Sequence, residues 1–161
     1  MASRVVKRLG DAKGTALVEA AIITPLFLLL TFSIVDFGGV FYAYLALENG
    51  VSLASRYGIT GRAIDDPMNP GTPLSHEETL KAAMRQGTPT LTIPDSAFTF
   101  AHRSAVGGGA WINGVGGPGE LERVSVDYTW QFFSPIVGVF FTNGQINLRV
   151  DSAMKNEGVF E

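Results

Sequence analysis

The sequence predicts an α+β protein, in which a long N-terminal transmembrane α-helix is followed by a small domain of one helix packed on an antiparallel β-sheet. Three observations lead to this fold class. No charged residue occurs between Ala20 and Val35, as is typical of a membrane-spanning helix. The residues after Leu47 are numerous enough for one small globular domain. In the C-terminal part, apolar and polar residues alternate with the period of a β-strand.

The apolar run is longer than a bilayer is thick. It is interrupted by Asp36 and continues to Leu47, so residues 15–47 would form a helix of about 50 Å at ~1.5 Å per residue. The hydrocarbon core of a bilayer measures only about 30 Å. We therefore expect the more apolar N-terminal part to lie in lipid and the remainder to project beyond it. Pro25 removes one helical hydrogen bond and should kink the helix.

The distribution of charge predicts how this helix is oriented. Four basic residues and one acidic residue precede Thr15, whereas eight basic and twelve acidic residues occur from Glu48 onward. The positive-inside rule keeps the basic end in the cytoplasm. We expect a single-pass protein with its N-terminus in the cytoplasm and its C-terminal domain in the periplasm or outside the cell. The acidic excess of that domain argues against nucleic acid as a partner.

No pattern in the sequence indicates catalysis or cofactor binding. The absence of cysteine excludes disulfides, and with only two histidines a structural zinc site is not expected. The glycine-rich stretch 107–119 lacks the GK[ST] of a phosphate-binding loop, which favours a flexible hairpin loop. Trp111 within it is either an exposed contact residue or a buried one. We therefore predict no enzyme, no cofactor and no metal site, and we treat His76 and His102 as ordinary structural residues.

The predicted organisation has three parts. Residues 1–14 form a basic leader, residues 15–57 form the transmembrane and projecting helix, and residues 58–161 form the domain. The leader is either a disordered cytoplasmic tail or a segment that a peptidase removes. Because the elements of the domain can bury a core among themselves, we expect the domain from about Gly58 to fold in water without the anchor.

Local patterns predict the elements of the domain. Ser75 and Glu78 form a capping box that begins a helix, and Gly87 ends it. An Asn143-Gly144 pair predicts a turn before the last strand. The predicted strands comprise residues 91–93, the segment around Phe98 and Phe100, residues 124–132 and residues 146–151.

The start of the apolar helix carries a resemblance. Gly14 follows the basic leader, Glu19 stands five residues later, and the apolar helix comes next. This arrangement resembles the cleavage site of type IV prepilins. The resemblance implies that a prepilin peptidase cuts after Gly14, so that Thr15 becomes the new N-terminus and Glu19 the fifth residue of the mature chain.

A wider resemblance covers roughly the first third of the chain. Residues 13–58 are similar to the TadE-like family of pseudopilins from tight-adherence (Flp-type) pilus systems. The residues that match are 16–19, Pro25, 36–38, 41–44 and 54–58, and residues 151–157 resemble the closing segment of the family more weakly. The major pilin of such systems is much shorter than this chain, which favours a minor component.

The resemblance implies a function in assembly. It predicts a minor pilin or pseudopilin of the bacterial inner membrane whose partners are the prepilin peptidase, other pilins or pseudopilins, the pilus assembly platform and membrane lipid. One alternative is a membrane-anchored periplasmic binding or sensory module with an uncleaved cytoplasmic tail. Another is an anchored enzyme, for which the sequence offers no site.

Four residues of the helix are candidate assembly residues. Glu19 is either an interfacial acid that reaches water or, as the resemblance implies, the partner of the Thr15 amine of a neighbouring subunit. Asp36 lies near the far interface, where an interfacial role and a partner contact are both open. Gly38 and Gly39 permit the close approach of another helix, or they mark a local weakness of this one.

Overall fold

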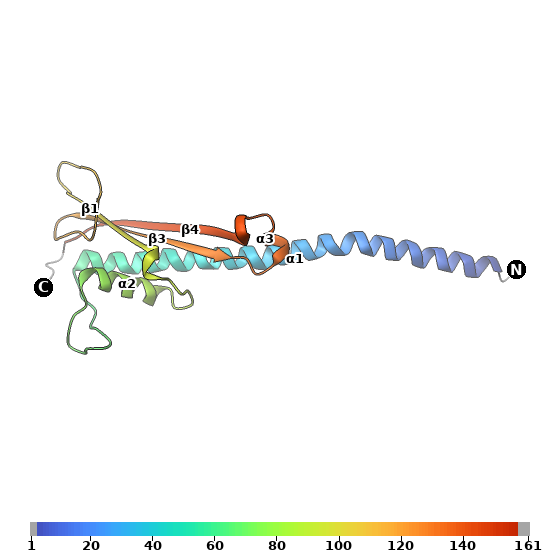
Figure 1. Cartoon of the computed structure of the whole chain (residues 1–161), viewed down its shortest axis with the longest axis horizontal. Coiled ribbons are helices and arrows are strands. Elements are labelled where there is room, and N and C mark those ends of the chain that lie inside the picture. The colour runs from blue at the N-terminus through green and yellow to red at the C-terminus, as the bar shows by residue number, and fades with distance from the viewer. Residues whose placement is uncertain (1–2, 158–161) are drawn as a thin grey trace. The chain divides into compact units, whose positions relative to one another are not determined.

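The computed structural model describes residues 3–157, with side chains from Gly14 onward. It confirms the predicted fold class: a long N-terminal helix is followed by a domain with a second helix and a four-stranded antiparallel sheet (Figure 1). The elements are α1 (Ser3–Thr60), α2 (His76–Gly87), β1 (Phe98–Arg103), β2 (Ile112–Asn113), β3 (Leu121–Gln131), α3 (Pro135–Gly138) and β4 (Gln145–Lys155), with short 3-10 turns at Asp95–Ala97 and Thr142–Gly144.

The helix α1 extends beyond the predicted limits at both ends. Its backbone is helical from Ser3, so the segment predicted as a leader is not irregular where the structure describes it. The side chains of the predicted basic leader before Gly14 lie outside the described part. Pro25 lies inside α1 without ending it, and the helix runs to Thr60 instead of about Tyr57.

The sheet has the strand order β2-β1-β3-β4. β1 and β3 pair antiparallel with Phe98 opposite Val126 and Arg103 opposite Leu121. β2 is a two-residue strand within the stretch that was predicted to be a loop, and its Asn113 pairs with Ala101 of β1. Strand β3 contains residues 124–131 of the strand that was predicted at residues 124–132.

The chain divides into two compact units. We call residues up to Gly39 together with Gln131–Gln145 the anchor unit, and Val40–Trp130 together with the residues from Ile146 onward the domain unit. Helix α1 and strands β3 and β4 contribute residues to both units.

The core of the domain unit includes one face of the second half of α1. This face contributes Ala43, Leu47, Val51 and Ala54, all buried, at the three- and four-residue spacing of an amphipathic helix. They join Leu80, Ala83 and Met84 of α2 and the buried sheet residues Phe98, Phe100, Val124, Val126, Leu148, Val150 and Met154. The core thus contains four side chains that precede the predicted boundary at Gly58.

The helix α2 begins and ends as its local sequence predicted. Ser75 is the N-cap, and its side chain accepts a hydrogen bond from the backbone N–H of Glu78 at 3.3 Å. The Glu78 carboxylate accepts from Lys81 Nζ at 2.9 Å instead of reaching back to the cap. Gly87 ends α2 at a close approach to the backbone of α1, since a Cβ on Gly87 would lie 2.7 Å from the Cα of Gly50.

Residues 91–93 do not form the predicted strand. The N–H of Leu91 donates to the carbonyl of Thr88 at 3.1 Å, which closes a turn. Pro94 follows, and it has no N–H to offer to a strand ladder. The apolar residues of this segment therefore do not mark a strand, and Ile93 packs in the core instead.

The two longest strands differ from their predicted limits by a few residues. β3 begins at Leu121 and ends at Gln131, so Phe132 falls outside it. β4 continues past Asp151 to Lys155. The Asn143-Gly144 turn is present, and Asn143 has the left-handed φ of 56° that Asn tolerates in turns.

Candidate functional site

From Ala20 to Val35, α1 carries no charged residue and exposes apolar side chains. The described part of this helix contains one stretch, within Gly14–Thr60, that is long and apolar enough to cross a membrane. Most of its large apolar side chains are more than 60% exposed, among them Leu17, Val18, Ile22, Ile23, Leu26, Phe27, Leu30 and Ile34, whereas Leu28 and Phe32 are 40% exposed. Exposed apolar area of this extent is rare in water-soluble proteins, and it is what a single-pass membrane protein presents to lipid.

The predicted cleavage residues lie at the start of this surface. Gly14, Thr15 and Glu19 are all exposed on α1, and a Cβ placed on Gly14 meets no described atom within 4 Å. Thr15 and Glu19 are four residues apart and therefore share one helix face. The structure of one chain leaves this face accessible to a peptidase or to a neighbouring subunit.

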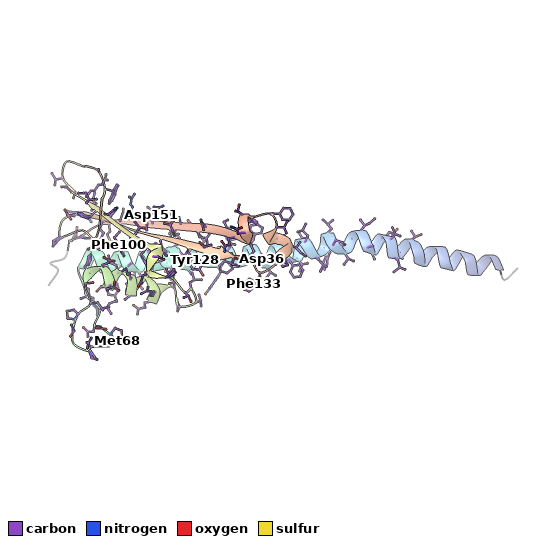
Figure 2. All side chains as sticks on the ribbon, viewed as in Figure 1. Asp36, Met68, Phe100, Tyr128, Phe133 and Asp151 are labelled. Carbon is purple, nitrogen blue, oxygen red and sulfur yellow. The ribbon has the colours of Figure 1, made fainter. Side chains whose placement is uncertain are left out.

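Asp36 is buried within the anchor unit and binds its own chain. It is 1% exposed, and its carboxylate accepts hydrogen bonds from the backbone N–H of Phe133 at 2.8 Å and of Ser134 at 3.1 Å. Figure 2 shows Asp36 and Phe133 close together. Sequence reasoning placed Asp36 at an interface and weighed water against a partner protein, and it missed this intrachain partner.

Aromatic rings hold the same segment against α1. Phe37 follows Asp36 and contacts Phe132 and Phe141 edge-on, with ring centroids 6.0 Å and 6.2 Å apart. Phe132 and Phe141 lie 4.3 Å from each other. Edge-on aromatic pairs at these distances are favourable beyond their buried area. The two Phe-Phe pairs of residues 132–133 and 140–141 are the sequence signal that could have drawn attention to this segment.

Of the adjacent glycines Gly38 and Gly39, Gly38 has free space where a side chain would be. A Cβ on Gly38 meets no described atom within 4 Å, so the structure shows no helix packed against this position. The close backbone approach occurs elsewhere, between Gly50 and Gly87 of the domain unit. Gly38 and its neighbour Gly39 therefore remain predicted assembly residues.

A buried acid lies in the domain unit as well. Glu122 is fully buried, and one of its oxygens lies 3.0 Å from His76 Nε2 and 2.8 Å from the Asn156 Nδ2 that donates to it. His76 is thus more than an ordinary first-turn residue, because its ring contacts this buried carboxylate. Residues 14–157 contain no group of three or more His, Cys, Asp or Glu that could hold a metal.

Trp111 of the glycine-rich stretch is neither fully exposed nor buried. Its ring lies between two guanidinium groups, with Arg103 at 4.7 Å and Arg123 at 4.3 Å from the ring centroid. Such cation–π contacts contribute modestly at partly exposed sites. His102 is a strand residue, as predicted, and its Nδ1 lies 3.2 Å from the carbonyl of Gly114.

Comparison with known proteins gives one finding, and it covers most of the helix α1. No curated protein and no solved structure matches the chain. One family model, described as TadE-like protein, matches residues 14–56. The matched segment begins at Gly14, includes Glu19 and Asp36, and ends in the face of α1 that enters the domain core. The match confirms the resemblance of residues 14–56 to the TadE-like family, and this similarity suggests a pilus-associated, pilin-like membrane protein.

Proposed function

We propose that this protein is a minor pilin or pseudopilin that is needed to assemble a tight-adherence (Flp-type) pilus. The observation that carries the proposal is the TadE-like match over residues 14–56, the segment that also bears the exposed apolar surface of α1. The protein would act through helix–helix and domain contacts and not through catalysis. Its partners would be other pilins or pseudopilins and the assembly platform in the inner membrane.

The proposal includes processing by a prepilin peptidase. The cut would fall between Gly14 and Thr15, and the exposure of this part of α1 is compatible with access by the enzyme. The mature chain would begin at Thr15, with its new α-amine one helical turn from Glu19. Residues 1–14 would be left on the cytoplasmic side, where their basic character directs them.

A mass measurement tests this function. Protein purified from its native host should have the mass of a chain that begins at Thr15, and Gly14→Lys should restore the full-length mass. Gly10→Lys, in the same basic segment, is the matched control and should still be processed. A full-length wild-type chain from cells with an active peptidase would contradict the proposal and favour the anchored module with an uncleaved tail.

The role of Glu19 follows from the same proposal. The Glu19 carboxylate of one subunit would pair with the Thr15 amine of a neighbour as both leave lipid for the filament. A charge-assisted hydrogen bond of this kind is stronger than a neutral one. The exposure of both residues on one helix face supports the pairing.

A further inference from the structure

A second apolar surface lies in the anchor unit, away from the N-terminal helix in sequence. We call residues 132–141 the apolar tip. No charged residue occurs from residue 128 to residue 148, and the tip exposes Phe133 (82%), Val139 (82%) and Phe140 (72%), with Ile136 at 41%. Exposed apolar side chains scattered singly are normal, whereas a contiguous patch indicates a binding surface.

The tip is continuous with the apolar surface of α1. A groove between them is lined by Pro25, Leu26 and Leu29 of the helix and by Ile136, Val139 and Phe140 of the tip. Leu26 precedes Asp36 by ten residues, which at ~1.5 Å per residue is about 15 Å along the helix. The tip therefore reaches back from Asp36 to the middle of the uncharged run of α1.

Most backbone N–H groups of the tip are paired, which lowers the cost of placing it in lipid. In hydrocarbon, each unsatisfied backbone polar group costs several kcal/mol, so irregular chain is excluded unless its groups are paired. Pro135 has no N–H, and Asp36 accepts from the amides of Phe133 and Ser134. Within the tip the amides of Ile136, Gly138, Val139, Phe140 and Phe141 donate to Ser134 Oγ or to tip carbonyls, and the amide of Phe132 donates to the carbonyl of Gly144.

We propose that the apolar tip inserts into the bilayer beside α1, so that the protein contacts the acyl chains through two separate segments. Lipid is the occupant that fits, because the tip continues the surface of the candidate span, carries no charge and pairs most of its backbone N–H groups. Interfacial segments of this kind bury about 5–10 Å into the boundary between headgroups and acyl chains. The inference rests on α1 as a membrane anchor and not on the pilus role.

The experiment exploits the absence of native cysteine. Val139→Cys and Phe140→Cys are each labelled with an environment-sensitive fluorophore in the full chain, which is then reconstituted in phosphatidylcholine–phosphatidylglycerol vesicles. Quenching is measured with nitroxides on the lipid acyl chains and with aqueous iodide. Val106→Cys is the matched control, since Val106 is equally apolar and 86% exposed but belongs to the domain unit. Leu30→Cys reports on the anchor itself.

We expect positions 139 and 140 to behave as position 30 does, with strong quenching by the lipid nitroxides and loss of quenching by iodide. Position 106 should show the reverse. Iodide quenching at 139 and 140 equal to that at 106 would overturn the inference. Protection from both quenchers would also overturn it, in favour of a second copy or another protein over the tip.

The controls separate the possible causes of failure. If position 30 is itself quenched by iodide, the anchor is wrong and the inference fails with it, whereas the proposed pilus function is judged independently by processing at Gly14. Labelled variants must retain the thermal melt of the wild type. Both labelled positions are exposed, so neither label is expected to disturb the fold. A folding defect in one variant would be revealed by a different result in the other.

Discussion

The two halves of α1 meet different surroundings and are built differently. Between Ala20 and Val35 the helix carries no charged residue and is exposed on nearly all sides. Between Ala43 and Ala54 only one stripe is buried, and the other faces carry polar residues such as Glu48. Lipid requires no polar face, whereas a helix at the surface of a domain needs a solvated one. We therefore expect substitutions in the two halves of this one helix to have different effects.

The largest expected effect comes from removing the second half of α1. A chain that begins at Gly58 lacks the four buried helix residues, of which Leu47 and Val51 each contribute about 1.5–3 kcal/mol by burial, against a total stability of about 5–15 kcal/mol for a typical domain. We expect that only a chain beginning at Val40 melts cooperatively by circular dichroism, with both chains in the same mild detergent.

This experiment also judges the boundary at Gly58 predicted from the sequence. We propose that the smallest unit that folds begins near Val40, because the core contains residues 43–54. A cooperative melt of the shorter chain at the temperature of the longer one would restore the original boundary and show that the helix face only covers a complete core.

A point substitution repeats the comparison within one residue type. Leu47→Ala should lower the free energy of unfolding by about 2–5 kcal/mol, the usual cost of truncating a buried leucine. Leu30→Ala, in the exposed half of α1, is the matched control and should leave the melt of the domain unchanged. Equal effects of the two variants, measured by denaturant titration in detergent micelles, would show that the halves do not differ as described.

Asp36 gives a smaller and local effect. Asp36→Ala removes the acceptor of the buried N–H of Ser134 and of the part-buried N–H of Phe133, a loss of about 1–3 kcal/mol for each buried group left unsatisfied. We expect faster hydrogen exchange at the amides of Phe133 and Ser134, with little change at the amides of β1. Asp36→Asn keeps one acceptor oxygen, so exchange at these two amides should be faster than in the wild type and slower than in Asp36→Ala. Unchanged exchange in Asp36→Ala would return Asp36 to the role of an interfacial acid or a partner contact.

The smallest effect on stability is expected at Glu19. Glu19→Leu removes an exposed charge that lipid disfavours, so membrane levels, processing at Gly14 and the thermal melt should not change. If the carboxylate pairs with the Thr15 amine of another subunit, its loss leaves that amine unpaired, at a cost of about 3–5 kcal/mol. Piliation or co-purification with other pilins should then fail.

The control for this last prediction is Glu48→Leu, which removes an exposed acid from the other half of the same helix. It should assemble normally. Wild-type piliation in Glu19→Leu would leave Glu19 as an acid that merely reaches water at the membrane surface.

Features with a local cause could be predicted from the sequence. The anchor follows from an uninterrupted apolar run, the start of α2 from the cap at Ser75, and β4 from alternation after the Asn143-Gly144 turn. The candidate residues Gly14 and Glu19 were recognised from a motif of neighbouring residues. Each of these patterns spans a few residues, so it is complete without knowledge of the fold.

Features that depend on distant residues were decided only by tertiary structure. Asp36 meets the amides of residues 133 and 134, which are 97 and 98 positions away, and Glu122 meets His76 of α2 and Asn156, the residue after β4. Residues 91–93 alternate as a strand would, but the Thr88–Leu91 turn and Pro94 prevent a strand from forming there. Periodicity indicates which side of an element is apolar, but the partner of that side is set by loop paths and strand register, which no local pattern encodes.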